Sequence, residues 1–322
     1  MTAVIANGFV VKQPGMLSLI QDAGRFGQHH LGLTEGGPAD KNAFDWCHRL
    51  LENVNNETAI EVSIGGLILQ SHCHTTGCIT GANNVVKKNG KVLPLWQTFE
   101  IVPNDVIEFG YATTGVRNYF SVAGGFQMQP QFGSCATVVR EGIGGINGKA
   151  LTAGDNLATM SNKNKRVCSL AKSKQPEYLD AVQLRIVLGY QLDWFTNHQV
   201  QRFLNASYEV SKQWDRMGYR LSGAKISANK TAMYSEGIAL GSVQIPADGQ
   251  PIILLHDRQT IGGYPKIGTV LSLDLDRLTQ CRQGAKITFE SISIEQAHNA
   301  LHLAKFNFEN TSVVKANDVA GS

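Results

Sequence analysis

Short apolar runs separated by glycine, proline and polar residues dominate this chain. Clear examples lie at residues 66–70, 106–109, 118–123, 184–188 and 252–255. Runs of this length that are rich in Val, Ile and Leu and end at turn residues are typical of β-strands. Several are apolar at every position, which is typical of strands covered on both faces or closed into a barrel. The pattern therefore predicts a mainly β protein, and the 33 glycines fit its many tight turns.

Helical periodicity is confined to three segments. Residues 38–51 begin with a proline and carry an apolar stripe, and Asp40 there is expected to cap the helix. Residues 193–203 form a shorter candidate. Residues 293–303 open with Ser293 and Gln296 at the spacing of a capping box. Residues 306–322 are expected to form a polar tail that frays after residue 308.

Two domains are expected from the length of 322 residues. A basic, polar stretch at residues 162–176 is typical of a connector. The prediction is an N-terminal β-rich domain at 1–165 and a C-terminal β-rich domain at 177–305, which the family resemblance described below implies are β-barrels. Residues 22–27 and 215–220 resemble each other weakly, and this suggests an internal duplication.

Charge and composition narrow the class of protein. The formal net charge is only +3 and its charges are dispersed, so no nucleic-acid or membrane footprint is expected. No apolar run approaches the roughly 20 residues that span a bilayer, and the N-terminus lacks the features of a signal peptide. A cytoplasmic location is therefore expected.

Cysteine and histidine give no metal-binding pattern. The six cysteines are scattered, and Cys73 and Cys78 lie near two histidines at a spacing that matches no common zinc motif. Glu295, His298 and His302 share one face of the last predicted helix, where an amphipathic surface is favoured over a metal site. No metal site is predicted.

Three polar constellations are candidates for chemistry. In the first, Asp22 and Arg25 flank a glycine, so the turn could either contact an anion or be braced by these side chains. In the second, Asp215 precedes Arg216 and Arg220, and here too an anion contact and a solvated ion pair stay open.

The third constellation, residues 235–268, is the densest and is predicted to handle a ligand. An apolar strand leads into a loop that combines glycines with acidic, basic, amide and hydroxyl side chains, and this is how binding sites tend to be built. Its candidate residues are Ser235, Gln244, Asp257, Gln259, Thr260, Gly262, Gly263, Tyr264 and Lys266.

Several familiar motifs are absent. The sequence has no Gly-x-x-x-x-Gly-Lys-Ser/Thr phosphate loop, no Gly-x-Ser-x-Gly and no His-Glu-x-x-His. It also lacks Met-Lys-Met, the signature of biotin attachment, so no covalent biotin is expected on this chain.

Together, these motifs resemble one family. They are Gln-Asp-Ala-Gly-Arg-Phe-Gly at 21–27, Thr-Gly-Ala at 80–82, Gly-Gly at 124–125, Asp-Arg-Met-Gly-Tyr-Arg-Leu at 215–221, and Asp-Arg-Gln-Thr-Ile-Gly-Gly-Tyr-Pro-Lys-Ile-Gly at 257–268. In this order they are similar to the biotin-dependent carboxyltransferase-like family, also called allophanate hydrolase subunit 2-like. The resemblance runs from about Gly8 to Phe289.

The resemblance implies two tandem cyclophilin-like β-barrels and a heteromeric enzyme. Stand-alone members look like the C subunit of an ATP-dependent 5-oxoprolinase, which opens 5-oxo-L-proline to L-glutamate with a KipI-like B subunit and a LamB/YcsF-type A subunit. The resemblance leaves open which subunit binds ATP. Two alternatives are a non-catalytic protein that binds a KipI-like kinase inhibitor and half of a urea carboxylase-type carboxyltransferase. The chain departs from the family at residues 133–137, where Cys135 and Ala136 replace the usual Arg and Ser.

On the enzyme hypothesis, the candidate residues divide into two groups. Asp257, Tyr264 and Lys266 are the expected catalytic or proton-handling groups. The remainder are expected to contact or orient the substrate, and they are Asp22, Arg25, Asp215, Arg216, Arg220, Ser235, Gln244, Gln259, Thr260, Gly262 and Gly263.

Overall fold

The computed structural model describes residues 7–54, 56–160, 167–230 and 233–315. It divides into two compact units. The first comprises residues 1–26, 36–178 and 312–322, and the second comprises residues 27–35 and 179–311. The predicted connector at 162–176 lies just before residue 179, although residues 162–166 of it fall outside the described residues. The sequence did not predict that residues 27–35 belong with the second unit.

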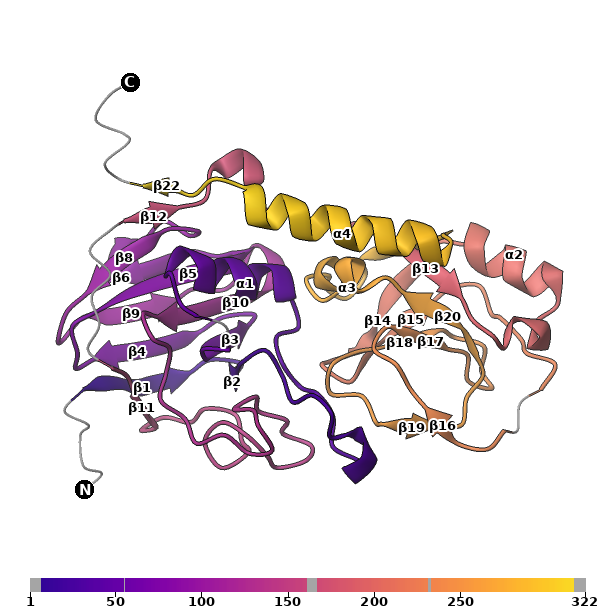
Figure 1. The fold of residues 1–322 in the computed structure, drawn as a ribbon, viewed down its shortest axis with the longest axis horizontal. Helices are drawn as coiled ribbons and strands as arrows, with labels where there is room; N and C mark the ends of the chain where they lie inside the picture. Colours follow the sequence, from indigo (N-terminus) through magenta and orange to yellow (C-terminus); the bar gives the residue numbers. More distant parts are fainter. Residues whose placement is uncertain (1–6, 55, 161–166, 231–232, 316–322) are drawn as a thin grey trace. The chain divides into compact units, whose positions relative to one another are not determined.

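Two sheets make up most of the first unit (Figure 1). The six-stranded sheet has the order β11-β1-β4-β9-β6-β7, and the five-stranded sheet has the order β2-β3-β10-β5-β8. A further pair, β12 and β22, stands apart from both sheets. The bounds are β1 Gly8–Pro14, β2 Leu17–Gln21, β3 Ala59–Ser63, β4 Leu67–Ser71, β5 Thr75–Asn83, β6 Val86–Lys88, β7 Lys91–Val92, β8 Thr98–Ile101, β9 Val106–Phe109, β10 Thr114–Val122, β11 Asn156–Ala158, β12 Cys168–Ser169 and β22 Val314–Lys315.

The core of this unit lies between its two sheets. Leu67 and Leu69 of β4 are fully buried and alternate with half-buried neighbours, as expected for a strand with one face on a core. Phe120 from the other sheet belongs to the same apolar cluster and makes edge-to-face contacts with Phe9 and Phe126. The shared cluster explains why these short strands form a stable unit.

Helix α1 (Lys41–Leu50) begins where the sequence predicted. The Asp40 carboxylate accepts a hydrogen bond from the Ala43 amide at 2.9 Å, which confirms Asp40 as the N-cap. Behind it, the fully buried Glu61 accepts hydrogen bonds from the Tyr119 hydroxyl and from the Ala39 amide. These contacts fix the start of α1 against β3 and β10.

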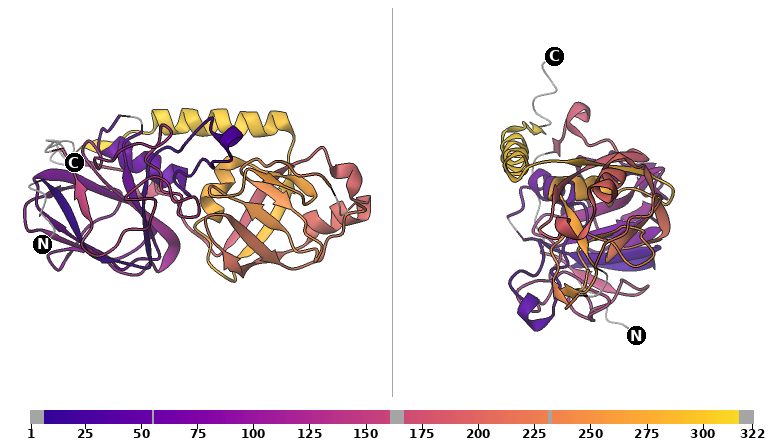
Figure 2. Two further views of the ribbon diagram at one scale, coloured as in Figure 1. Left: turned by 90° about the horizontal axis from the view of Figure 1, so that it is seen from below. Right: turned by 90° about the vertical axis from the view of Figure 1, so that its right-hand side faces the viewer.

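The second unit is built around a closed barrel of seven strands, in the order β13-β20-β17-β18-β15-β14-β21. Figure 2 shows these strands curving around a common interior. Only β13 and β21 pair in parallel within the barrel. The bounds are β13 Ala181–Leu188, β14 Tyr208–Trp214, β15 Gly218–Ser222, β17 Ser242–Gln244, β18 Ile252–Leu254, β20 Lys266–Val270 and β21 Lys286–Ser291.

A short ribbon accompanies the barrel. Its strands are β16 (Glu236–Gly237) and β19 (Ile261–Gly262), and they pair antiparallel over two residues each. We call residues 233–238 and 259–265 together the ribbon. It carries much of the segment that the sequence predicted to handle a ligand.

The other helices agree only partly with the prediction. Helix α2 (Asn197–Asn205) is shifted toward the C-terminus, and α3 (Ser272–Leu278) was not predicted. Helix α4 (Ile294–Asn310) has the predicted Ser293–Gln296 capping box but continues beyond residue 303, so residues 306–310 are helical. Short 3₁₀ turns lie at His29–Leu31, Lys172–Lys174 and Leu192–Trp194.

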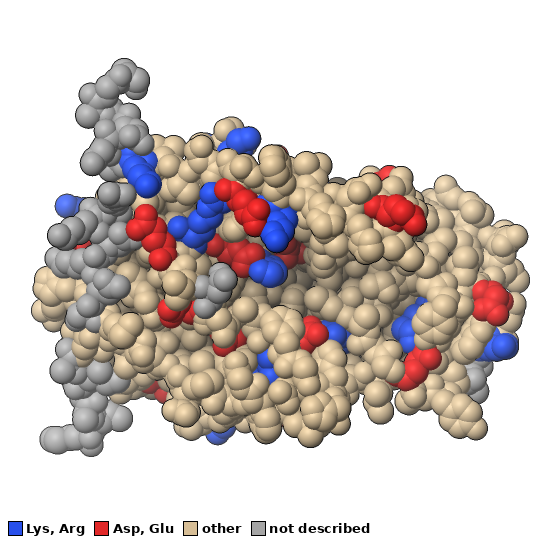
Figure 3. Space-filling model, in the orientation of Figure 1, with Lys and Arg blue, Asp and Glu red and all other residues tan. Residues whose placement is uncertain are grey.

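The mainly β prediction is confirmed, including the barrel of the second unit. In the first unit the strands lie in the two larger sheets and the β12–β22 pair. None of the described helices is both long and apolar enough to cross a membrane. On the face drawn in Figure 3, acidic and basic side chains lie beside one another among mostly uncharged residues.

We predict that His48 of α1 makes stability depend on pH. Burial, aided by the charge of Lys41, lowers the pKa of this imidazole from 6.5 to about 3. The unfolded chain therefore binds a proton below pH 6.5 that the folded chain binds only near pH 3, so stability is lost as pH falls. Between pH 8 and pH 5 this group costs about 2 kcal/mol of unfolding free energy. Denaturant unfolding of wild type and His48→Gln at both pH values measures the difference, and equal losses in the two proteins would contradict the prediction.

Candidate functional site

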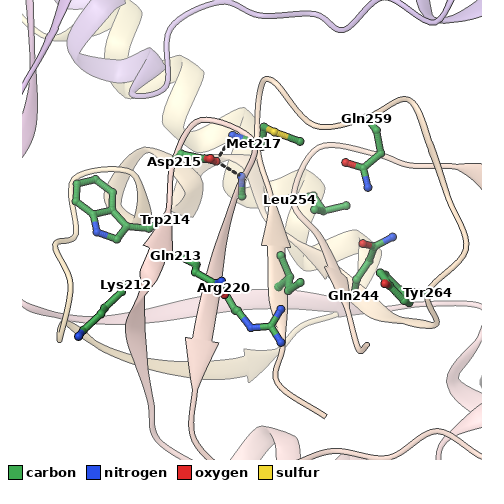
Figure 4. Close-up of a pocket in the computed structure, with 12 residues that line it drawn as sticks. Lys212, Gln213, Trp214, Asp215, Met217, Arg220, Gln244, Leu254, Gln259 and Tyr264 are labelled. Carbon is green, nitrogen blue, oxygen red and sulfur yellow. Dashed lines mark hydrogen bonds between the residues drawn. The ribbon is translucent and has the colours of Figure 1, made fainter. Parts of the chain in front are cut away.

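A pocket of about 460 Å³ opens on the barrel of the second unit. It lies over β14, β15, β17 and β18, with the loop after β18 along one side (Figure 4). Its lining residues are Lys212, Gln213, Trp214, Asp215, Met217, Gly218, Arg220, Gln244, Ile252, Leu254, Gln259 and Tyr264. Five of these were predicted from the sequence, namely Asp215, Arg220, Gln244, Gln259 and Tyr264.

The lining combines apolar and hydrogen-bonding surface. Ile252, Leu254 and Met217 present aliphatic groups, Gln259 adds a carboxamide, and the carboxamide of Gln244 lies near the phenol of Tyr264 (Figure 4). A pocket of this size and chemistry suits a small molecule with an apolar body and a few polar groups.

Asp215 shapes the pocket wall. Its Oδ1 accepts hydrogen bonds from the Met217 amide at 2.7 Å and from the Gly218 amide at 3.2 Å (Figure 4). The side chain thereby mimics a backbone turn, as aspartate often does between strands. We assign Asp215 a structural part in the β14–β15 turn, and direct contact with a ligand stays a prediction.

Arg216 and Asp257 bind each other. Arg216 Nε and Nη2 each donate to one oxygen of the Asp257 carboxylate, both at 2.9 Å, and the two residues are 5% and 6% exposed. This two-point geometry is the strongest form of the Arg–carboxylate pair. Neither residue lines the pocket. Arg216, a predicted anion contact, and Asp257, a predicted catalytic residue, therefore form a buried ion pair that supports the site.

Arg220 reaches the pocket from β15 and pairs with Asp248. The Asp248 side chain is about half exposed, so solvent screens this pair and it contributes little to stability. A ligand carboxylate could therefore bind Arg220 either alongside Asp248 or in place of it.

Gln244 lies on the pocket wall at the end of β17. It is 1% exposed, and its Nε2 makes no hydrogen bond to any described residue. Gly262 of the ribbon covers it closely, since a Cβ on Gly262 would lie 2.9 Å from that nitrogen and 2.5 Å from Ile238 Cδ1. Because Gly262 has no side chain, the Gln244 carboxamide fits beneath it.

Lys266, a predicted catalytic residue, is held by a cluster beside the ribbon. Glu236 Oε1 accepts hydrogen bonds from Lys266 Nζ, the Tyr190 hydroxyl and Gln191 Nε2. Burial would raise the pKa of the Glu236 carboxyl, but the hydrogen bonds from Lys266, Tyr190 and Gln191 and the charge of Lys266 outweigh it, and the pKa lies below its ordinary value. Glu236 therefore carries its charge at neutral pH and ties the ribbon to the barrel.

Ser235, Thr260, Gly262 and Gly263, the remaining predicted residues of the ribbon, do not line the pocket. The Thr260 backbone carbonyl accepts a hydrogen bond from the Ile238 amide at 3.0 Å, and this bond joins the two halves of the ribbon. Ser235 is exposed, and its hydroxyl would lie 3.6 Å from a Cβ on Gly263.

Asp22 and Arg25 lie in the first unit and brace its loop at 131–136. Asp22 accepts hydrogen bonds from the Ser134 hydroxyl and the Cys135 amide. Arg25 is fully buried and donates to the backbone carbonyls of Gln131, Ser134 and Ala136. These contacts support the bracing alternative, and a ligand contact for either residue stays a prediction.

Sequence reasoning missed one wall of the pocket and the anchor of the ribbon. Lys212, Gln213 and Trp214 line the pocket because β14 bulges between Val210 and Trp214. The polar run at 211–213 was the available signal. Glu236 stands inside the predicted segment, but its partner Tyr190 is 46 residues away, so no local pattern shows the cluster.

Comparison with known proteins places the chain in a family. The family described as carboxyltransferase domain, subdomain A and B, matches residues 31–291. The C subunit of 5-oxoprolinase from Haemophilus influenzae is 36% identical over 279 residues, which cover 86% of this chain and 89% of that protein. The protein of the same name from Escherichia coli is 31% identical over 287 residues, covering 89% and 92% respectively.

The fold also recurs within a much larger protein. The K. lactis urea amidolyase structure matches with a TM-score of 0.89 at 23% identity. The match covers 95% of this chain but only 20% of that one, so this chain spans about a fifth of its length. This chain belongs to the carboxyltransferase domain A and B family, as its motifs predicted.

We predict that Asp257→Ala destabilises the protein regardless of any role in chemistry. The substitution leaves the Arg216 guanidinium buried without its carboxylate, and breaking such a pair costs about 3–5 kcal/mol. The double variant Arg216→Met/Asp257→Leu should recover most of that loss because no charge stays buried. Denaturant unfolding measures both. A single variant as stable as wild type would show that the pair does not support this region.

We also predict that Gly262→Ala disturbs the pocket while Gly237→Ala, on the paired strand of the ribbon, does not. The new methyl group at 262 overlaps Ile238 and Gln244, and such overpacking costs about 1–3 kcal/mol. A Cβ at 237 meets nothing within 4 Å. Thermal unfolding of the two variants provides the comparison, and equal effects would argue against close packing of Gly262 on Gln244.

Proposed function

We propose that this chain is the C subunit of an ATP-dependent 5-oxoprolinase that acts in the cytoplasm with a KipI-like B subunit and a LamB/YcsF-type A subunit. The observation that carries the proposal is the match, over most of both chains, to two proteins that bear the name of the 5-oxoprolinase C subunit. The pocket on the barrel supports it because its volume and lining suit a small ligand.

In the proposed reaction, ATP phosphorylates the lactam oxygen of 5-oxo-L-proline and water opens the ring. The products are L-glutamate, ADP and phosphate, and two water molecules are consumed overall. This chain contributes the substrate pocket. The ATP site is assigned to the complex and not to particular residues of this chain.

The candidate residues are assigned different roles in this reaction. Arg220 is the group best placed to meet the substrate carboxylate, because its partner Asp248 is exposed enough to be displaced. The Tyr264 phenol is about half exposed and lines the pocket, so it can orient the substrate or pass a proton. Asp257 and Lys266 act on this proposal through the supports that they form with Arg216 and Glu236.

Reconstitution tests the proposal directly. The A, B and C subunits together should form glutamate from 5-oxoproline in an ATP-dependent reaction, and omitting this chain should abolish the activity. Unchanged glutamate formation without this chain would refute the proposal. Binding of this chain to the B subunit without any contribution to turnover would support a regulatory protein instead.

Within the reconstituted enzyme, Arg220→Gln should lower kcat/KM by about 10- to 100-fold, mainly through KM, because a charge-assisted contact to the substrate carboxylate is lost. Arg202→Gln on the exposed face of α2 is the matched control and should leave kcat/KM within twofold of wild type, or about 0.4 kcal/mol. Steady-state kinetics at several 5-oxoproline concentrations separates the two effects. Equal kinetics for both variants would exclude Arg220 as a substrate contact.

A further inference from the structure

The pocket wall contains a buried carboxamide whose amide nitrogen has no hydrogen-bond partner among the described residues. Gln244 is 1% exposed, and its Nε2 has no partner within the described part of the chain. Leaving a buried donor without an acceptor is costly, and most buried polar groups are satisfied. Because Gln244 lines the pocket, a bound ligand is the natural source of the missing partner.

A carboxamide is selective about what it pairs with. It presents a carbonyl oxygen and an amide N–H side by side. The cis-amide of a small lactam presents the complementary pair on one edge of its ring, so two antiparallel hydrogen bonds can form. This match holds for either orientation of the glutamine amide. A carboxylate supplies only acceptors, and an amine at neutral pH supplies only donors.

The surroundings of Gln244 suit a small ring. Ile252 pairs with Gln244 in the β17–β18 ladder, and Ile252 and Leu254 both supply aliphatic surface to the pocket. On the covering side, Gly262 has no side chain, and any larger residue there would collide with the amide. Tyr264 lies beside Gln244 (Figure 4), and Gln259 also lines the pocket, so the ligand edge would meet polar groups while its methylenes meet the apolar ones.

We propose that Gln244 recognises the cis-amide edge of a lactam and that the pocket thereby selects lactams over carboxylate and amine ligands. This inference rests on the proposed function and deepens it, since it names the atoms that distinguish the lactam substrate from other small molecules. Gln244 is a specificity-determining residue here and does not take part in bond breaking.

The test uses ligand-observed NMR titrations with the full chain and three probes. 2-Pyrrolidinone carries the complete cis-amide edge, N-methyl-2-pyrrolidinone lacks the N–H, and pyrrolidine lacks the carbonyl. Wild type should bind 2-pyrrolidinone saturably and bind the other two at least about tenfold more weakly, because a buried hydrogen-bonding group is left unpaired. Gln244→Met should lose this preference, whereas Gln201→Met, on exposed α2, should keep it.

The outcomes are distinguishable. Equal binding of 2-pyrrolidinone and its N-methyl derivative to wild type overturns the inference, and so does the absence of saturable 2-pyrrolidinone binding. The wild-type comparison stands even if Gln244→Met fails to fold, which thermal unfolding reports. A chain that shows the lactam preference yet is dispensable for glutamate formation would refute the proposed function alone. A chain required for glutamate formation that shows no such preference would refute this inference alone.

Discussion

The buried pair between Arg216 and Asp257 is the interaction on which the candidate site depends. It joins the turn between β14 and β15 to the segment that follows β18, and the two backbones also bond there, from the Asp257 amide to the Arg216 carbonyl at 2.9 Å. On either side of the pair, Asp215 and Gln259 project to the pocket. A charged pair in a buried position stabilises only when its geometry is good, and here both carboxylate oxygens are engaged. The pair therefore adds a buried side-chain link to the backbone contacts that hold these two pocket walls together.

A second charged cluster fixes the ribbon. Glu236 collects three donors from Tyr190, Gln191 and Lys266, while the Gln191 side chain also accepts the Lys266 amide at 2.7 Å. Two residues of pairing between β16 and β19 would hold such a ribbon only weakly. The cluster supplies the additional contacts, and the ribbon in turn covers Gln244 with Gly262. The charged cluster thus fixes the ribbon, and the ribbon in turn fixes the position of the neutral Gln244 side chain in the pocket wall.

Much of this arrangement could be predicted from the sequence because it depends on local pattern. Short apolar runs between glycines predicted the strands, and Asp40 and Ser293 predicted two helix starts through their capping chemistry. The end of α4 was missed, because residues 304–310 lack the apolar periodicity that marks a helix and only Ala297 of α4 is buried. The polar segment at 235–268 supplies Gln244, Gln259 and Tyr264 to the pocket wall, and its contact with a ligand stays a prediction.

The pairing of side chains could not be predicted, since it depends on register between strands that are distant in sequence. Arg216 meets Asp257 because Gly218 lies opposite Leu254 in the β15–β18 ladder. For the same reason, two residues expected to contact substrate or do chemistry proved to hold each other. The similar motifs at 22–25 and 215–216 also diverge, since Arg25 binds backbone carbonyls and Arg216 binds a carboxylate.

Under the proposed function, the pocket on the C-terminal barrel receives the lactam. A crystal structure of this chain with 5-oxo-L-proline tests it most directly. Density for the ring is expected in the pocket lined by Ile252 and Leu254, with its amide edge within hydrogen-bonding distance of Gln244 and its carboxylate toward Arg220. Density for the ligand at another site, with this pocket holding only solvent, would contradict it.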